Sequence, residues 1–531
     1  MDNYKITNDI LGAVKHLAPL GGVLLTVYAL YWFALGIYRV FLSPIAQFPG
    51  PKLAAFTTGY QAYFDIVQYG QFFKHLNKLH DKYGPVVRIN PHELHINDPA
   101  FIDVLYAGSN KKRDKFKWQG RAVLLPDSLV ATEPHDLHRK RRAAVNPYFS
   151  KQNVRKLDPV VIDSLNAILK RLDDAARSGT PWHASLAFKA ATCDIITYFS
   201  FGESTKYMDM PDYNAVYFEA VDDHLHMGYK MTYISWLGPL MDRIPASVMG
   251  WVYPGLQSLW SMHAKWIDQI EAIRAEPKRE GYESVFHGLL QADLPPSEKS
   301  TARLRQEAQL LVLAGQDTTA YTLSCLTYRI LANPDVYRKL KAELVQAIPD
   351  PDAPLSSARL EQLPYLTAVI QEGIRLHPGA LVRQSRVATE QSMIYVDQTT
   401  KKQWTIPAGT PVAMDATSCN LNAAYWEDPE TFRPERWIEN PRLDRHLISF
   451  SKGTRICLGI NLAYSELYVL LGGIVRRYDL YDGTDTQTSP TLALYDTTYD
   501  KDIKVRYDCL VPFPTKGSKG VQVKVRPGIP V

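Results

Sequence analysis

The chain has 531 residues, of which 46% are hydrophobic, and a formal net charge of +5. This charge is spread too thinly to indicate a nucleic-acid-binding protein. The five cysteines are scattered and include no C-x-x-C pair, which argues against a zinc site or a redox dithiol. No Gly/Ser/Pro linker divides the chain after residue 60, so we expect one large domain.

The N-terminal region contains an uncharged apolar segment at residues 17–38, long enough to cross a bilayer as a helix. We expect a short segment at 1–16 before this anchor and a proline-rich hinge at 39–52 after it. A secretory signal peptide is the alternative, but it requires a shorter apolar core and a small-residue cleavage site. Basic residues on the two sides balance, so charge leaves the orientation of the anchor open.

Two short strands are predicted next, at Val86–Asn90 and Glu93–Ile96, around a turn. A basic run, His135–Arg142, follows. His138 and Arg142 are four residues apart and share one face of a helix, where both can reach an anionic group. Arg139, Lys140 and Arg141 either face an acidic partner or form a solvated basic surface.

A long helix capped by Ser300-Thr301 is predicted to continue to Asn333-Pro334. Its middle reads Ala314-Gly315-Gln316-Asp317-Thr318-Thr319. Flexible glycine and threonines that compete for backbone hydrogen bonds are unfavourable inside a helix, and such a broken local rule indicates a functional site. The alternative is a helix kink in which the threonines bond to their own helix.

Pro334 and Pro364 begin two further helices, the second ending at His377-Pro378. The second contains Glu372 and Arg375, three residues apart on one face, which can form a charge-assisted pair.

The loop Phe450–Gly459 presents Cys457 just before an apolar helical pattern that begins at Ile460. A thiolate exposed in such a loop can bind haem iron, and its electron donation favours cleavage of the O–O bond of dioxygen. The positive end of the following helix would help to hold the sulfur as a thiolate. Arg455 can pair with a haem propionate. The alternative is a buried structural cysteine.

After this loop, residues 505–525 alternate apolar and polar residues around Pro512–Gly517, which predicts a hairpin.

The motif F-x-x-G-x-R-x-C-x-G at 450–459, the motif A-G-x-D-T-T at 314–319 and Glu372-x-x-Arg375 together resemble the cytochrome P-450 superfamily. The resemblance covers residue 45 to the end and implies a mainly α fold with small β-sheets (α+β). A catalytic domain at 53–531 would follow one N-terminal transmembrane helix. The implied cofactor is haem b, with Cys457 as its axial iron ligand.

The resemblance also implies roles for the remaining motif residues. Thr318 would hydrogen-bond the oxygen species at the iron, and Asp317 would relay protons from water. The other implied haem contacts are Phe450, Gly453 and Gly459 in the cysteine loop, Ala314 and Gly315 leaving room over the haem, and Arg142, His138, Arg383 and Arg455 at the propionates. His138 stands where the family usually has tryptophan. Arg436 would join Glu372 and Arg375 in a structural network.

The implied activity is monooxygenation of an apolar small molecule, a fungal secondary metabolite of terpenoid or polyketide type. Dioxygen is the co-substrate, and electrons come from NADPH through a cytochrome P-450 reductase. The enzyme would sit in the endoplasmic reticulum membrane with its catalytic domain in the cytosol. Residues 118–130, 209–254 and the tail hairpin would lie near the substrate. A haem-thiolate isomerase or dehydratase and a non-catalytic haem-binding protein are the alternatives.

Overall fold

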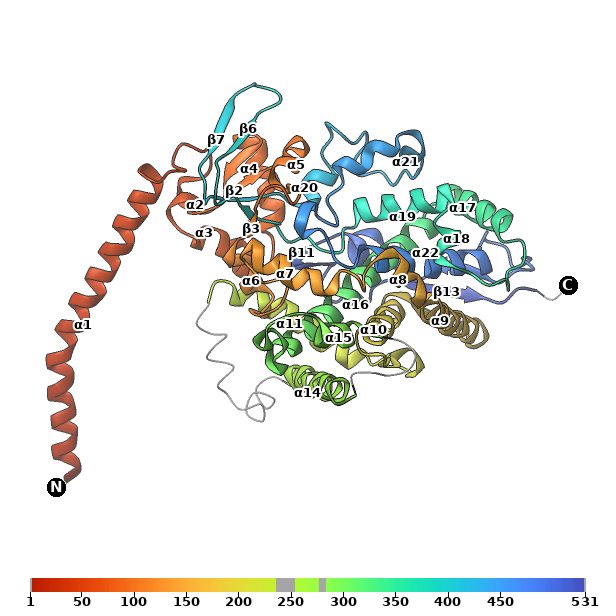
Figure 1. Ribbon diagram of the computed structural model, residues 1–531, viewed down its shortest axis with the longest axis horizontal. Coiled ribbons are helices and arrows are strands. Elements are labelled where there is room, and N and C mark those ends of the chain that lie inside the picture. Colours follow the sequence, from red (N-terminus) through yellow and green to blue (C-terminus); the bar gives the residue numbers. More distant parts are fainter. Residues whose placement is uncertain (1, 235–253, 277–282, 530–531) are drawn as a thin grey trace.

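The computed structural model describes residues 2–234, 254–276 and 283–529. A long helix, α1 (Asp2–Phe41), projects from the body and includes residues 2–16 (Figure 1). Its stretch Gly21–Phe41 is 21 residues long with a mean hydropathy of 1.6, long and apolar enough to cross a membrane. The large apolar side chains between Val23 and Phe33 are 43% to 70% exposed, so they are no part of the body's core.

The body is mainly helical, as predicted. Pro334 and Pro364 stand at the first positions of α17 and α19, where a missing N–H costs no hydrogen bond, and Ser300 is the N-cap residue of α16. The helices of the body are α2 (Lys52–Phe56), α3 (Gly59–Ala62), α4 (Phe72–Tyr83), α5 (Ile102–Leu105), α6 (Lys117–Ala122), α7 (His135–Val145), α8 (Lys151–Val154), α9 (Asp158–Ser178), α10 (Ala184–Phe201), α11 (Ala215–Met231), α14 (Pro254–Ala275), α15 (Val285–Gln291), α16 (Thr301–Leu331), α17 (Pro334–Ala347), α18 (Ser357–Leu360), α19 (Pro364–Leu376), α20 (Ala416–Asn420), α21 (Glu435–Glu439) and α22 (Ile460–Arg477).

The strands form small sheets beside the helices. The described residues form a five-stranded sheet ordered β1-β2-β8-β5-β3, a four-stranded sheet ordered β4-β13-β10-β9, and the pairs β6-β7 and β11-β12. The predicted pairing of β1 with β2 is confirmed and is antiparallel. The strands are β1 (Val86–Arg88), β2 (Leu94–Ile96), β3 (Asp114–Lys115), β4 (Trp182–His183), β5 (Arg386–Val387), β6 (Met393–Val396), β7 (Gln403–Ile406), β8 (Pro411–Ala413), β9 (Asp479–Leu480), β10 (Thr491–Leu494), β11 (Tyr507–Cys509), β12 (Val511–Phe513) and β13 (Gln522–Arg526).

Helix α16 runs through the middle of the body and packs against α10, α14, α19 and α22. The largest apolar cluster of the described residues surrounds it. Because α16 is covered on several faces, its buried residues do not form one apolar stripe and include polar ones such as Gln309 and Gln316. Residues of α16 that are exposed despite this packing therefore border an opening between α16 and its neighbours.

The predicted hinge at 39–52 is packed onto the body. The buried Arg88 side chain donates from Nη1 to the carbonyl oxygen of Arg39 (2.8 Å), and the Arg88 backbone N–H donates to the carbonyl oxygen of Pro49 (2.7 Å). Ile45 and Phe48 are buried in the apolar cluster beside the five-stranded sheet. Hydrogen bonds to Arg88 and buried apolar side chains therefore hold the segment that follows α1 on the body.

The predicted tail hairpin is placed differently in the structure. The turn lies at Leu510, between β11 and β12, while residues 522–526 join β10 and β4 in another sheet. Leu510 has a positive φ of 76°, and its N–H donates to Oδ1 of Asp508 (3.0 Å). This side-chain bond stabilises a turn at a residue type that usually avoids such a conformation.

Candidate active site

The loop before α22 presents Cys457, as predicted. Its N–H donates to the carbonyl oxygen of Phe450 (2.8 Å), which closes the loop. Gly453 has a φ of +70°, and a Cβ there would lie 2.4 Å from the carbonyl oxygens of Tyr106 and Ala107, so only glycine fits. Gly459 is the N-cap residue of α22. Cys457 is exposed whereas the other four cysteines are buried, which argues against the structural alternative.

The surroundings of the Cys457 sulfur include two groups that favour a thiolate. Although the side chain is accessible, the sulfur lies deep among protein atoms, and this desolvation raises the pKa of the thiol, while the Gly459 N–H and the positive charge of Arg142 oppose the shift. Arg142 is held in place because its Nη1 donates to the carbonyl oxygen of Ile456 (2.6 Å). His138 is buried on the same helix, α7, as the four-residue spacing predicts.

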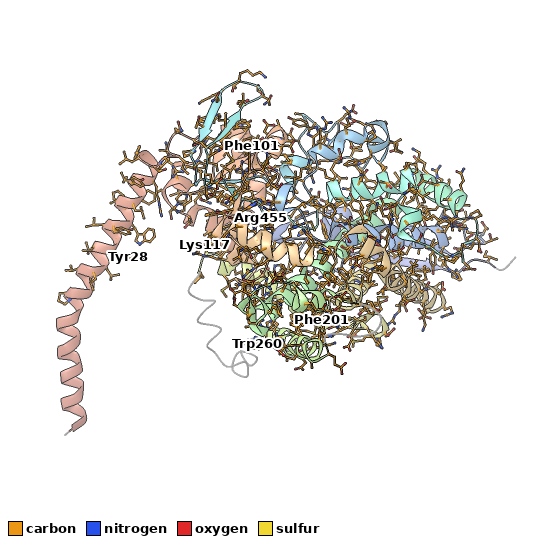
Figure 2. The ribbon with its side chains drawn as sticks, viewed as in Figure 1. Tyr28, Phe101, Lys117, Phe201, Trp260 and Arg455 are labelled. Carbon is orange, nitrogen blue, oxygen red and sulfur yellow. The ribbon has the colours of Figure 1, made fainter. Side chains whose placement is uncertain are left out.

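A group of cations lies beside the cysteine loop. Arg455 donates from Nη1 and Nη2 to the carbonyl oxygens of Thr132 and Glu133, both at 2.7 Å, and its Nε has no partner among the described residues. Figure 2 shows Arg455 well inside the molecular outline. Lys115 and Arg386 stand opposite each other on β3 and β5. Like charges in such a cross-strand pair repel, which indicates a place for an anionic group.

The electrostatics of this cation cluster, defined as Lys115, His138, Arg142, Arg386 and Arg455, point the same way. Burial, then Arg386 and Arg455, lower the pKa of Lys115 to about 7. Burial and the neighbouring cations hold the pKa of His138 far below its usual value, so that imidazole is neutral. Because the positive charges exceed nearby negative ones, the cluster suits two carboxylates of a bound ligand.

Arg383, predicted at a propionate, is buried beside two aromatic rings. Its guanidinium is 5.0 Å from the ring centre of Phe72 and 5.5 Å from that of Trp118, and its charge acts on the buried Asp65. Arg386, three residues further along the chain, lies in the cation cluster, where its charge acts on Lys115 and Arg455. Neither Arg386 nor Lys115 was a candidate from the sequence.

The basic run on α7 divides into two faces. Arg139 and Lys140 are exposed. Arg141 is buried, and its Nε lies 2.7 Å from Glu298. Arg141 thus belongs to an internal ion pair, and only Arg139 and Lys140 are available to an acidic partner.

The middle of α16 is open on one side. Ala314 is exposed although most of the helix is buried, and Gly315 and Thr318 are partly exposed. A Cβ at Gly315 would lie 2.6 Å from Cγ1 of Ile196 on α10, which explains the glycine by close packing. The Thr318 hydroxyl donates to the carbonyl oxygen of Ala314 (2.9 Å). This self-bonded arrangement is the one expected for the kink alternative, and it leaves the hydroxyl oxygen able to accept.

Asp317 is buried on another side of α16. Its Oδ2 accepts from Nε2 of Gln316 (3.2 Å), and its Oδ1 lies 3.5 Å from Nζ of Lys189 on α10. Burial raises the pKa of Asp317 to about 6, and Lys189 opposes this shift. A carboxyl group of this pKa can take up and release protons near neutral pH.

The predicted Glu372–Arg375–Arg436 network is present in the geometry. Glu372 accepts from Nε and Nη2 of Arg375, both at 2.8 Å, from Nε of Arg436 (3.1 Å) and from Nε1 of Trp437 (2.9 Å). Glu372 and Arg375 are fully buried. Arg375 also donates to the carbonyl oxygens of Asn420 and Pro429. The network joins α19 to the segment that precedes the cysteine loop.

These residues fit a haem with a cysteine ligand. α16 packs on α22, and Thr319 of α16 is bonded to Glu466 of α22, so α16 lies beside the helix that follows the Cys457 loop. The cation cluster beside Cys457 suits the propionates. The described residues contain no group of three or more His, Cys, Asp or Glu side chains that could hold a metal ion.

Comparisons with known proteins agree with this geometry. The family model described as cytochrome P-450 matches residues 51–498. The chain is 40% identical to the cytochrome P-450 monooxygenase tpcC of Cochliobolus heterostrophus, over 96% of this chain and 97% of that protein. It is 38% identical to the monooxygenase astB of Talaromyces wortmannii (95% and 97%) and 36% identical to the tryptophan 6-hydroxylase fscE of Fusarium equiseti (96% and 98%). The chain therefore belongs to the cytochrome P-450 family and is a haem-dependent monooxygenase.

Proposed function

We propose that this enzyme hydroxylates or epoxidises an apolar small molecule of fungal secondary metabolism, of terpenoid or polyketide type. The observation that carries the proposal is the exposed Cys457 in the loop that leads into α22, the helix on which α16 packs. Dioxygen is the co-substrate, and NADPH supplies electrons through a cytochrome P-450 reductase. The relatives are named monooxygenases and a hydroxylase, which supports oxygen insertion over isomerase or dehydratase chemistry.

In this proposal the cofactor is haem b and Cys457 is its iron ligand. Bound haem supplies the activation of dioxygen and the transfer of one oxygen atom to substrate. The Gly453 and Gly459 loop positions the sulfur, and the Gly459 N–H with Arg142 favours its ionised form against the opposing effect of burial. The cation cluster holds the propionates, with Arg455 contributing an Nε that has no partner among the described residues.

Thr318 and Asp317 deliver protons. The Thr318 hydroxyl lies at the open stretch of α16, where its oxygen can accept a hydrogen bond. Turning its O–H away from Ala314 costs about one hydrogen bond, or 0.5–1.5 kcal/mol, which a better acceptor on the open side offsets. Asp317, with a pKa of about 6, supplies the protons from its buried position next to Thr318 in the chain.

The proposed redox partner and membrane location are based on exposed residues of α7 and on helix α1. Arg139 and Lys140 are exposed on α7, the helix that also carries Arg142, so an acidic reductase docking there would come close to the cysteine ligand. Helix α1 would anchor the enzyme in the endoplasmic reticulum membrane with its body in the cytosol. The roof predicted at 209–254 lies partly outside the described residues. The name of the Fusarium relative adds indole amino acids to the substrates worth testing.

The test combines a spectrum with turnover. The reduced protein with carbon monoxide should absorb at the long wavelength of a thiolate-ligated haem, and Cys457→Ala should lose this band while Cys325→Ala, a buried control, keeps it. With a reductase, NADPH and a panel of apolar metabolites, wild type should form oxygenated product. An unchanged spectrum in Cys457→Ala refutes the ligand. Product formed without consumption of dioxygen refutes the monooxygenase assignment.

A further inference from the structure

Residues 127–133, here called the strap, lie between α6 and α7 and bind two members of the cation cluster. Arg455 donates from Nη1 and Nη2 to the carbonyl oxygens of Thr132 and Glu133 (both 2.7 Å), and Lys115 donates from Nζ to another carbonyl oxygen of the strap. Because both Nη atoms of Arg455 are bound to the strap, the position of the strap determines where the Nε–H of Arg455 points. The strap thus forms the frame on which these two cations are mounted.

The strap is held at its start by the second turn of α16. Gln306 accepts at Oε1 from the Asp127 N–H (2.8 Å), and its Nε2 donates to Oδ2 of Asp127 (3.0 Å). The next residue, Glu307, accepts at Oε2 from the Leu129 N–H (3.1 Å). Gln306 and Glu307 are only 9% and 1% exposed, so water competes little for these bonds. Helix α16 therefore fixes two successive points of the strap.

The strap is also held from α7. Arg141 donates from Nη1 to the carbonyl oxygen of Asp127 (2.9 Å) and to the hydroxyl oxygen of Thr132 (2.8 Å). Asp127 is thus bound by α7 at its carbonyl group and by α16 at its N–H and its carboxylate. Thr132 is bound by Arg141 at its hydroxyl group and by Arg455 at its carbonyl group. The strap therefore connects α16 and α7 with the cysteine loop.

The two supports of the strap are joined by a row of alternating charges. Glu298 lies 2.7 Å from Nε of Arg141 and 2.8 Å from Nε of Arg303, and Arg303 lies 3.1 Å from Glu307. These four side chains are at most 14% exposed. Two guanidinium groups and two carboxylates have no net charge, so the row has little attraction for an anion of its own. It stabilises the strap without competing for the anionic group at the cation cluster.

We propose that Gln306 and Glu307 are positioning residues for the haem, which act through the strap to keep Arg455 and Lys115 directed at the propionates. This inference rests on the proposed haem site. Positive charges held near the iron favour its less positive, reduced state, and their hydrogen bonds to the propionates oppose loss of the haem. Releasing the strap should therefore lower the reduction potential of the haem and speed its dissociation.

The test uses full-length haem-bound protein with Gln306→Met, which removes both bonds to Asp127 and changes no charge. The haem reduction potential, followed by redox titration of the absorption spectrum, should fall. Transfer of haem to excess apomyoglobin should become about two- to tenfold faster, as expected for the loss of a buried hydrogen bond. The matched control is Gln309→Met, one turn further along α16, because Gln309 is also buried but lies 3.4 Å from the imidazole of His224 on α11. The control should keep wild-type values.

Two further variants show whether the effect passes through the strap and Arg455. Asp127→Ala removes one of the two bonds at an exposed side chain and should also speed haem transfer, by a smaller factor. Arg455→Met should lower the potential and speed haem transfer by itself. In the Arg455→Met background, Gln306→Met should change both values much less than it does in wild type, because the two residues act in one chain of contacts.

The outcomes separate this inference from the haem site on which it rests. The carbon monoxide band of thiolate-ligated haem in each variant verifies that the site is assembled. Wild-type values in Gln306→Met, equal shifts in Gln306→Met and Gln309→Met, or full additivity with Arg455→Met overturn this inference alone. A wild-type potential and rate of haem transfer in Arg455→Met overturn the placement of the propionates at the cation cluster, and this inference with it.

Discussion

Replacing Glu372 by glutamine should destabilise the whole body. Glu372 is fully buried and, among the described residues, is the carboxylate partner of both Arg375 and Arg436. Glutamine keeps the volume but removes the negative charge, so two buried guanidinium groups lose their counter-ion. Breaking a buried pair costs about 3–5 kcal/mol. That is a factor of about a hundred to several thousand in the folded-to-unfolded ratio.

The loss is large because a folded domain is stable by only about 5–15 kcal/mol. Denaturant unfolding followed by tryptophan fluorescence should show a lower midpoint for Glu372→Gln, since Trp437 donates to Glu372 and reports on the site. Haem content should fall with it. The control is Glu427→Gln, because Glu427 is 77% exposed and its pair with Arg433 contributes about 1 kcal/mol or less. A midpoint for Glu372→Gln equal to that of the control would refute the reasoning.

Three further predictions concern other parts of the molecule. In an assay with reductase, Thr318→Ala should lower the yield of product per NADPH several-fold and divert the electrons to hydrogen peroxide. The Thr319 hydroxyl is bonded to Glu466 of α22, so Thr319→Ala should lower this yield less. Equal losses in the two variants would indicate an effect on helix geometry instead of proton delivery. Burial raises the pKa of Glu466 well above 4.5, so as the pH rises the carboxyl group loses its proton in the unfolded chain before it does in the folded protein. The free energy of unfolding of the wild type should therefore fall with rising pH, by up to about 1.4 kcal/mol per pH unit relative to Glu466→Gln. Parallel pH profiles of the two proteins, measured by denaturant unfolding, would contradict this. Deleting residues 1–42 should abolish resistance to carbonate extraction and leave a folded haem domain, and a truncated protein as resistant as the full chain would exclude α1 as the anchor.

Sequence reasoning worked best where local signals and spacing agreed. Pro334 and Pro364 predict where α17 and α19 begin, and His377-Pro378 predicts where α19 ends. The spacing of His138 and Arg142 predicts that they share one face of α7. The same rule applied to Arg141 shows why it is buried: it lies three residues after His138, on the same face. In the sequence, Arg141 stands among four consecutive basic residues, 139–142, so its spacing from His138 is not apparent.

The features that were not predicted depend on side-chain direction, on pairing between distant strands and on an unusual backbone conformation. Arg383 and Arg386 are three residues apart in an extended segment, so their side chains point to opposite sides, and the sequence does not tell which side meets the cysteine loop. Lys115 joins the cluster only because β3 pairs with β5, a contact between residues far apart in the chain. The tail turn at Leu510 depends on a conformation that leucine rarely adopts.

The glycine at position 315 also determines a clearance. α16 lies between a tight contact with Ile196 and the open stretch at Ala314. A methyl group at Gly315 would come within 2.6 Å of Ile196, so either that side chain moves or α16 shifts toward its open side and narrows the space there. The width of the space beside Ala314 therefore depends on the contact between Gly315 and Ile196 of α10.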